Sequence, residues 1–176
     1  FMKTTKKLLA VAAFCIAALA SQAQSFGDNK VLSFGVGFGG SAFMYSGSDA
    51  TLPPLQVSLE FPMSEKIGVG GLLGYAGSKW EGFGFKVTYS YILVGGRAYY
   101  HLVNTDKMDA YGALTLGYNI ASSKISGAGL GTAASASGLL WGGVVGMRYY
   151  LSDKFAVNGE LGYGLAILTV GLSMKL

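Results

Sequence analysis

The sequence has 176 residues, a length that suits a single domain. It is apolar, with a mean hydropathy of +0.43 and 28 glycines, yet no run of 18 or more apolar residues is present, which excludes a membrane-spanning helix. The net charge of +4 falls to +1 beyond position 23, because three of the 13 basic residues and none of the 9 acidic residues precede it. Without clustered Lys and Arg, a nucleic-acid partner is not expected.

The N-terminal segment has the three-part layout of a secretory signal peptide. Lys3, Lys6 and Lys7 form a basic region, residues 8–20 are apolar, and Ser21-Gln22-Ala23 places small residues at positions −3 and −1 of a cleavage site. The apolar stretch is shorter than the ~20 residues that a membrane-spanning helix needs. We therefore predict a cleaved signal peptide over residues 1–23 and a mature domain over residues 24–176, exported to the cell envelope.

Alternation of apolar and polar residues recurs along the rest of the chain and predicts β-strands. In residues 55–61 the odd-numbered side chains are apolar and the even-numbered ones are polar. The same period recurs in residues 108–118, 155–163 and 168–176, and residues 32–38 form a first strand in this interpretation. Glycine weakens a helix by ~1 kcal/mol relative to alanine, so the high glycine content also favours strands.

An internal repeat marks the ends of these strands. Three short polar turns each end in an acidic residue and a lysine, followed by an apolar residue; they are Ser64–Lys66, Asn104–Lys107 and Ser152–Lys154. Each following strand ends in Gly-Tyr, at Tyr75, Tyr118 and Tyr163. The separation is about one membrane crossing, since a tilted strand needs ~9–11 residues. Three hairpins with a first and a last strand predict eight strands.

The connections at the opposite end are longer, over residues 40–54, 76–85 and 120–138, with a tight one at Gly164. Aromatic residues gather at both ends. We expect Tyr75, Tyr118, Trp141 and Tyr163 near the outer rim, and Phe61, Tyr100, Tyr149 and Phe155 near the inner rim. Two aromatic belts and loops of unequal length are typical of outer-membrane barrels. In lipid, a sheet can satisfy the hydrogen bonds of all its backbone groups only by closing into a barrel. We therefore predict an all-β, closed, antiparallel up-and-down transmembrane barrel of about eight strands, with short periplasmic turns and longer outer loops.

With these features the chain resembles the small eight-stranded outer-membrane β-barrel family, which includes the transmembrane domain of outer-membrane protein A and outer-membrane protein X. The resemblance covers residues 31–176 and rests on patterns along the whole length. The last strand is similar to the C-terminal insertion signal of the family, although it ends on Leu176 where that signal usually has an aromatic residue. The resemblance implies a location in the bacterial outer membrane and contact with its lipid.

The inward faces of the predicted strands collect three acidic and three basic side chains. They are Glu60, Arg97, Asp109, Arg148, Glu160 and Lys175. An eight-stranded barrel is just wide enough for side chains to fill its interior. Buried charges are tolerated when they are paired and hydrogen-bonded. We predict a paired network that fills the lumen, with Tyr99, Tyr111 and Tyr150 as hydroxyl partners; the alternative is a narrow, gated ion path.

Catalytic, metal and cofactor sites are not expected. His101 is the only histidine, the only cysteine belongs to the predicted signal peptide, and no carboxylate cluster lies close to His101 in the sequence. The Gly-x-Gly-x-x-Gly pattern of residues 35–40 lacks the helix that would make it a nucleotide site. The main hypothesis is a structural or interaction barrel that meets other envelope proteins through its outer loops. Alternatives are a small passive channel and a soluble periplasmic barrel that binds a lipid-like ligand.

Overall fold

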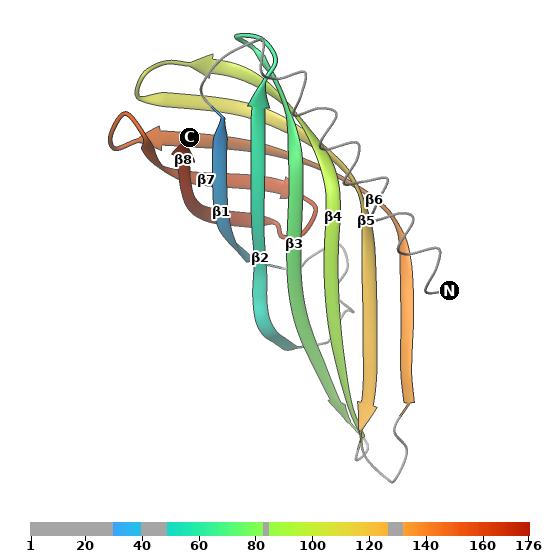
Figure 1. Cartoon of the computed structure of the whole chain (residues 1–176). Coiled ribbons are helices and arrows are strands. Elements are labelled where there is room, and N and C mark those ends of the chain that lie inside the picture. The colour runs from blue at the N-terminus through green and yellow to red at the C-terminus, as the bar shows by residue number, and fades with distance from the viewer. Residues whose placement is uncertain (1–29, 40–48, 83–84, 127–131) are drawn as a thin grey trace.

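The computed structural model contains a closed β-barrel in which every strand is antiparallel to both neighbours and β1 pairs with β8 (Figure 1). It describes residues 30–39, 49–82, 85–126 and 132–176, so the predicted signal peptide lies outside the described residues. The strands are β1 (Val31–Phe38), β2 (Asp49–Pro62), β3 (Ile67–Gly82), β4 (Phe85–Asn104), β5 (Met108–Ser126), β6 (Thr132–Tyr150), β7 (Phe155–Tyr163) and β8 (Leu168–Lys175). The predicted fold class and strand number are confirmed.

The three short turns lie together at one end of the barrel, here called the turn end (upper left in Figure 1). Each turn uses a hydroxyl oxygen that accepts a hydrogen bond from the backbone N–H three residues later. The donors are Ile67 to Ser64 at 3.1 Å, Met108 to Thr105 at 3.0 Å and Phe155 to Ser152 at 3.1 Å. The repeat in the sequence therefore reflects local turn chemistry, because Ser and Thr side chains satisfy backbone groups in tight turns.

Strands at the opposite, outer end differ greatly in length. β3 to β6 have 16, 20, 19 and 19 residues, whereas β1, β7 and β8 have 8, 9 and 8. The three short strands β7, β8 and β1 thus form a low wall, and β3 to β6 extend beyond it. This extension is here called the outer sheet (Figure 1, lower right), and it consists of residues 76–82, 85–91, 121–126 and 132–142.

The predicted outer loops are wrong in extent. Residues 49–54 belong to β2, the described part of 76–85 belongs to β3 and β4, and the described part of 120–138 belongs to β5 and β6. Ladder pairing continues to Gly82 opposite Phe85 and to Ile125 opposite Thr132. The small residues of these segments led us to predict loops, but four adjacent strands supply hydrogen-bond partners for their backbone. The remaining parts of the predicted loops, residues 40–48, 83–84 and 127–131, lie outside the described residues.

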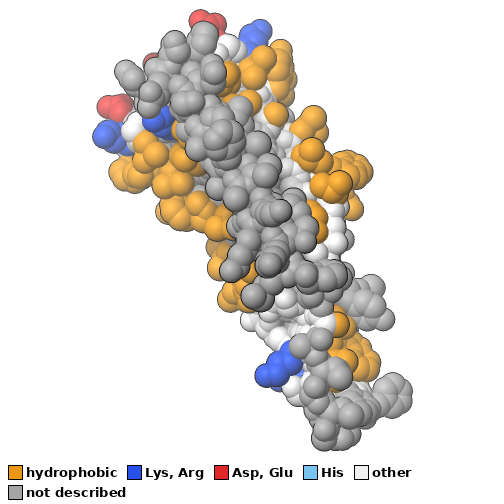
Figure 2. All heavy atoms as spheres, turned by 45° about the vertical axis from the view of Figure 1, so that its right-hand side comes forward, with side chains coloured by type: hydrophobic (Ala, Val, Ile, Leu, Met, Phe, Trp, Pro, Cys, Tyr) orange, Lys and Arg blue, Asp and Glu red, His pale blue; other side chains and the backbone are white. Residues whose placement is uncertain are grey.

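The outward face of the barrel is apolar. Leu114, Leu116 and Leu172 are among many large hydrophobic side chains that are more than half exposed. In Figure 2 hydrophobic side chains line both flanks of the molecule, and charged side chains appear toward its two ends. Among the described residues there is no helix with the length and hydropathy of a membrane span.

Candidate functional site

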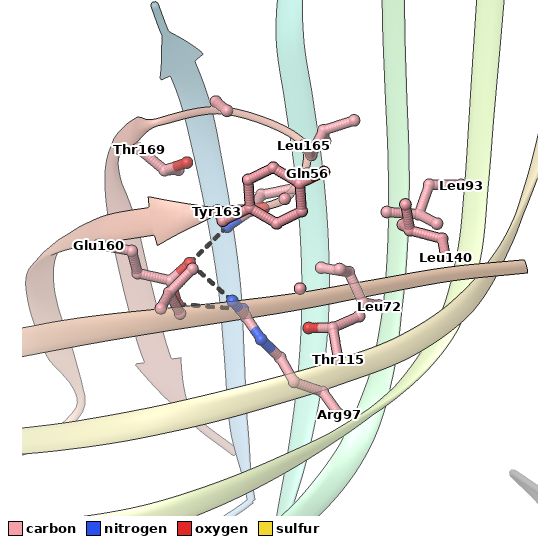
Figure 3. A pocket seen from close by; sticks show the side chains of 14 residues that line it. Gln56, Leu72, Leu93, Arg97, Thr115, Leu140, Glu160, Tyr163, Leu165 and Thr169 are labelled. Carbon is pink, nitrogen blue, oxygen red and sulfur yellow. Dashed lines mark hydrogen bonds and ion pairs between the residues drawn. The ribbon is translucent and has the colours of Figure 1, made fainter. Parts of the chain in front are cut away.

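The candidate site is the lumen, where polar side chains from opposite walls meet. Arg97 on β4 and Glu160 on β7 lie on strands that are not neighbours, so their contact crosses the barrel (Figure 3). The two guanidinium nitrogens Nη1 and Nη2 each donate to one carboxylate oxygen of Glu160, at 3.0 Å. Tyr111 Oη donates to the same carboxylate at 2.7 Å and Gln56 Nε2 at 2.9 Å. A carboxylate has about four acceptor sites, so Glu160 is fully satisfied.

A second group of charges closes the lumen nearer the turn end. Arg148 on β6 donates from Nη1 to Asp109 at 2.8 Å and from Nη2 to Glu60, on the opposite wall, at 2.7 Å. The remaining oxygen of each carboxylate contacts His101, at 2.6 Å from Nδ1 to Asp109 and 2.7 Å from Nε2 to Glu60. Glu60, Arg148, Asp109 and His101 therefore form a closed ring of hydrogen bonds, here called the ionic ring, and all four are buried.

Aromatic side chains and glycines shape the space around the ionic ring. The guanidinium of Arg148 lies 4.4 Å from the ring centre of Tyr111, a cation–π contact. A Cβ on Gly68 would collide with the carboxylate of Glu60, and one on Gly146 would lie 2.6 Å from the Tyr111 ring. Glycine at these two positions leaves room for the large polar groups that cross the lumen.

The structure brings together five of the six predicted lumen charges and leaves out Lys175. The Lys175 ammonium lies 4.0 Å over the ring of Tyr150, and it makes no ion pair with a described residue. Placing Lys175 in the paired network was therefore wrong. It is the last residue of β8 and borders the open cavity at the turn end.

His101 takes the place in the network that Lys175 was expected to hold. No carboxylate cluster lies close to His101 in the sequence, but the fold brings Asp109 and Glu60 to its two ring nitrogens. The 105–107 turn folds β5 back on β4, pairing Asn104 with Asp109 and His101 with Tyr111, with a register shift between His101 and Val103. The register shift brings His101 onto the face of Asp109, because an unshifted count from the Asn104–Asp109 pair would place His101 opposite Gly112. Glu60 comes from another strand, so neither partner of His101 had a local signal in the sequence.

Two cavities lie on either side of the ionic groups. One of about 250 Å³ opens at the turn end and is bordered by His101, Arg148 and Lys175. The other, of about 20 Å³, lies between Arg97 and Leu165 and has room for about one water (Figure 3). No residue borders both cavities, so the ionic groups separate them.

The outer half of the lumen is apolar. It is filled by a buried cluster of Leu72, Ala76, Tyr91, Leu93, Leu140 and Leu165. Leu165 belongs to the short connection between β7 and β8, and a Cβ on Gly74 would lie 2.6 Å from its side chain. This inward glycine therefore accommodates Leu165 and does not leave a void.

Seven of the eight predicted belt residues have outward side chains that are exposed or half-exposed. At the turn end these are Tyr100, Tyr149 and Phe155, and toward the outer end Tyr75, Tyr118, Trp141 and Tyr163. Trp141 and Tyr163 pack together, with ring centres 5.5 Å apart. Placing Phe61 in the inner belt was wrong, because it is 6% exposed and the Lys30 ammonium lies 5.8 Å from its ring centre.

The outer sheet has a free edge along β6. Residues 143–150 of β6 pair with β7, which ends at Tyr163. Residues 132–142 pair only with β5 among the described strands.

At the tip of the β3–β4 hairpin, Lys86 and Lys79 lie 3.3 and 3.6 Å from Glu81. They hold the pKa of the Glu81 carboxyl below its usual value, Lys86 by its hydrogen bond and both lysines by their charge.

A closed antiparallel barrel with an apolar outer face, exposed aromatic residues toward both ends and a polar interior is a transmembrane β-barrel. The model of the outer membrane protein β-barrel domain family matches residues 8–171, and the chain belongs to this family. The protein is therefore an outer-membrane barrel. The apolar exterior argues against the soluble lipid-binding alternative, although apolar residues also face inward in the outer half of the lumen.

The solved structures that this chain is similar to share little sequence with it. The N-terminal β-barrel domain of Pseudomonas aeruginosa OprF is 15% identical, with a TM-score of 0.50, and the match covers 84% of this chain and 96% of that one. Ail, the attachment invasion locus protein of Yersinia pestis, is 15% identical with a TM-score of 0.49, over 84% of this chain and 93% of that one. No curated protein matches the chain.

Proposed function

We propose that this protein is a non-enzymatic interaction barrel, closed to solutes, that binds an extended segment of a partner envelope protein along the free edge of β6. The observation that carries the proposal is the edge of residues 132–142, which pairs with β5 but with no other described strand and lies beyond the barrel wall. An exposed sheet edge binds peptides by strand addition, in which main-chain hydrogen bonds supply affinity. No catalytic role is proposed, because each described lumen carboxylate is already paired with an arginine.

The hydrogen bonds at the turn end of β6 show to which side each backbone N–H of this strand points. The N–H of Tyr150 donates to Lys107 on the β5 side at 2.9 Å, whereas the N–H of Leu151 donates to Phe155 on the β7 side at 2.8 Å. The pairing of β5 with β6 shows no register shift. Because hydrogen-bonding direction alternates along a strand, the odd-numbered residues from Ala133 to Trp141 direct their N–H groups to the free edge.

This edge lacks the features that usually protect edges from pairing. Residues 132–142 contain no charged residue and no proline, whereas the outer part of β2, at the other side of the low wall, contains Asp49, Pro53 and Pro54. Charges and prolines block strand addition. The contrast favours β6 as the edge that receives a partner.

The test is to compare Ser137→Pro with Ser137→Ala. Both variants remove the hydroxyl that accepts a 3.2 Å hydrogen bond from Tyr118, but only proline removes the edge-facing N–H while sparing the ladder to β5. Binding would be measured against an array of extended peptides from envelope proteins. We expect peptides that bind the wild type and Ser137→Ala alike and Ser137→Pro at least tenfold more weakly. Equal binding of all peptides to both variants would contradict the proposal.

A small passive channel is the second candidate, and the cavities on both sides of the ionic groups favour it. Single-channel recording of the refolded barrel in a planar bilayer separates the two. Discrete, reproducible conductance steps would support the channel. A silent bilayer, with folding confirmed by a heat-dependent gel shift, would support the closed barrel.

Export by a cleaved signal peptide is also part of the proposal. The basic region, apolar stretch and Ser21-Gln22-Ala23 motif support cleavage after Ala23. The intact mass of the protein isolated from outer membranes tests it: a chain that begins at Gln24 is expected, and a mass that includes residues 1–23 would contradict it.

A further inference from the structure

We propose that His101 is a proton-binding site that holds the turn end of the lumen closed. The inference goes beyond the interaction role and concerns the barrel itself. It rests on the geometry of the ionic ring, on the balance of charges in the lumen and on the open cavity beside His101.

The geometry requires two ring protons on His101. Both ring nitrogens lie within hydrogen-bond distance of carboxylate oxygens, at 2.6 Å and 2.7 Å. An ionised carboxylate accepts hydrogen bonds and donates none, whereas a neutral imidazole carries a single N–H. With Asp109 and Glu60 both ionised and held by Arg148 through their other oxygens, only the imidazolium form of His101 completes both contacts.

The charge balance leads to the same protonation state. The buried network contains three carboxylates, Glu60, Asp109 and Glu160, but only two guanidinium groups, Arg97 and Arg148. Lys175 makes no ion pair with a described carboxylate. A protonated His101 neutralises the third carboxylate, and an unpaired charge in a water-poor interior is costly.

Protons reach His101 through the cavity of about 250 Å³ that opens at the turn end. The titratable and charged groups around it come from five strands and one turn. They are Glu60 on β2, Tyr99 on β4, Asp109 and Tyr111 on β5, Arg148 and Tyr150 on β6, Lys175 on β8, and Glu65 in the turn after β2. Only Glu60 and Asp109 contact the imidazole nitrogens.

Loss of the proton would open the ionic ring. A neutral His101 donates to one carboxylate only, so one side of the ring loses its bridge and the lumen gains an uncompensated negative charge. The Arg148–Glu60 and Arg97–Glu160 pairs would then be the remaining ionic contacts across the lumen. We expect the turn end to loosen and small ions to leak as the pH rises through the titration of His101.

The protonation state can be measured directly because His101 is the only histidine in the sequence. In protein labelled with 15N-histidine and reconstituted in bilayers, long-range proton–nitrogen NMR spectra report how many ring nitrogens carry a proton. We expect two protonated nitrogens at neutral pH and the loss of one at alkaline pH. A single neutral tautomer at neutral pH would overturn the proposal, whether or not any variant folds.

Ion leakage from vesicles gives the functional readout. Wild-type protein is expected to leak at least tenfold more at alkaline than at neutral pH, and His101→Gln is expected to leak at both. Lys175→Gln is the matched control, since Lys175 borders the same cavity outside the ionic ring and should keep the wild-type pH dependence. Leakage that is independent of pH in the wild type would refute the role of the His101 proton in closing the lumen, whereas conduction by the wild type at neutral pH would refute the closed barrel instead.

Discussion

Replacing Arg97 with methionine removes the guanidinium that donates two hydrogen bonds of 3.0 Å to Glu160 across the lumen. The side chains of this pair are 2% and 7% exposed, so solvent screens them little. Loss of one partner of a buried ion pair typically costs about 3–5 kcal/mol, because the other charge stays buried and uncompensated. Tyr111 and Gln56 continue to donate to Glu160, which places the expected loss for Arg97→Met near 3 kcal/mol, at the lower end of that range.

The assay is reversible urea unfolding of the refolded barrel in lipid vesicles, followed by tryptophan fluorescence and a heat-dependent gel shift. The double variant Arg97→Met with Glu160→Gln is the control, since it removes both charges and keeps similar volumes. It should recover most of the lost stability. A loss below about 1 kcal/mol for Arg97→Met, the range of exposed ion pairs, would refute the conclusion that this contact is a buried bridge.

Two further perturbations test the lumen and the lipid face. Gly68→Ala places a Cβ against the Glu60 carboxylate and should destabilise the barrel by about 1–3 kcal/mol. Gly112→Ala is the control: a Cβ there meets nothing within 4 Å, so the variant should be neutral or slightly stabilising. Equal unfolding midpoints for the two variants would contradict the lumen packing. Leu114→Arg, outward and between the two aromatic ends, should cost about 2–4 kcal/mol in bilayers, and Leu139→Arg, paired with Tyr118 near the outer belt, about 0–1 kcal/mol. Similar costs at the two positions in urea unfolding would show that depth in the membrane was assigned wrongly.

Which side chains point into the lumen was predicted from the alternation along each strand, but which of them contact one another was not. Alternation places Arg97 and Glu160 on inward faces because successive side chains on a strand point to opposite sides. Their pairing depends on the distance across the closed barrel, because the two residues are 63 positions apart in the sequence. His101 shows the same limit, since Asp109 reaches it only through the register shift between β4 and β5, while Glu60 comes from β2.

The outer strands show a different limit. Ser, Ala and Gly in residues 121–126 and 132–138 have weak strand preferences, and local pattern therefore favoured loops. The backbone there is extended because adjacent strands supply ladder partners as far as Ile125 opposite Thr132. Where β7 ends, the same pairing leaves residues 132–142 of β6 with a free edge, a feature that exists only in the assembled sheet.

The sequence alone determined the period of the strands, the three hydroxyl-capped turns and the apolar outward face, because these depend on neighbours within a few residues. Tertiary structure decided which charges pair, that His101 and not Lys175 completes the network, and where the sheet leaves an open edge. The physical reason is that contacts across a lumen and along a sheet depend on closure and shear of the whole barrel, and no local stretch of sequence encodes either.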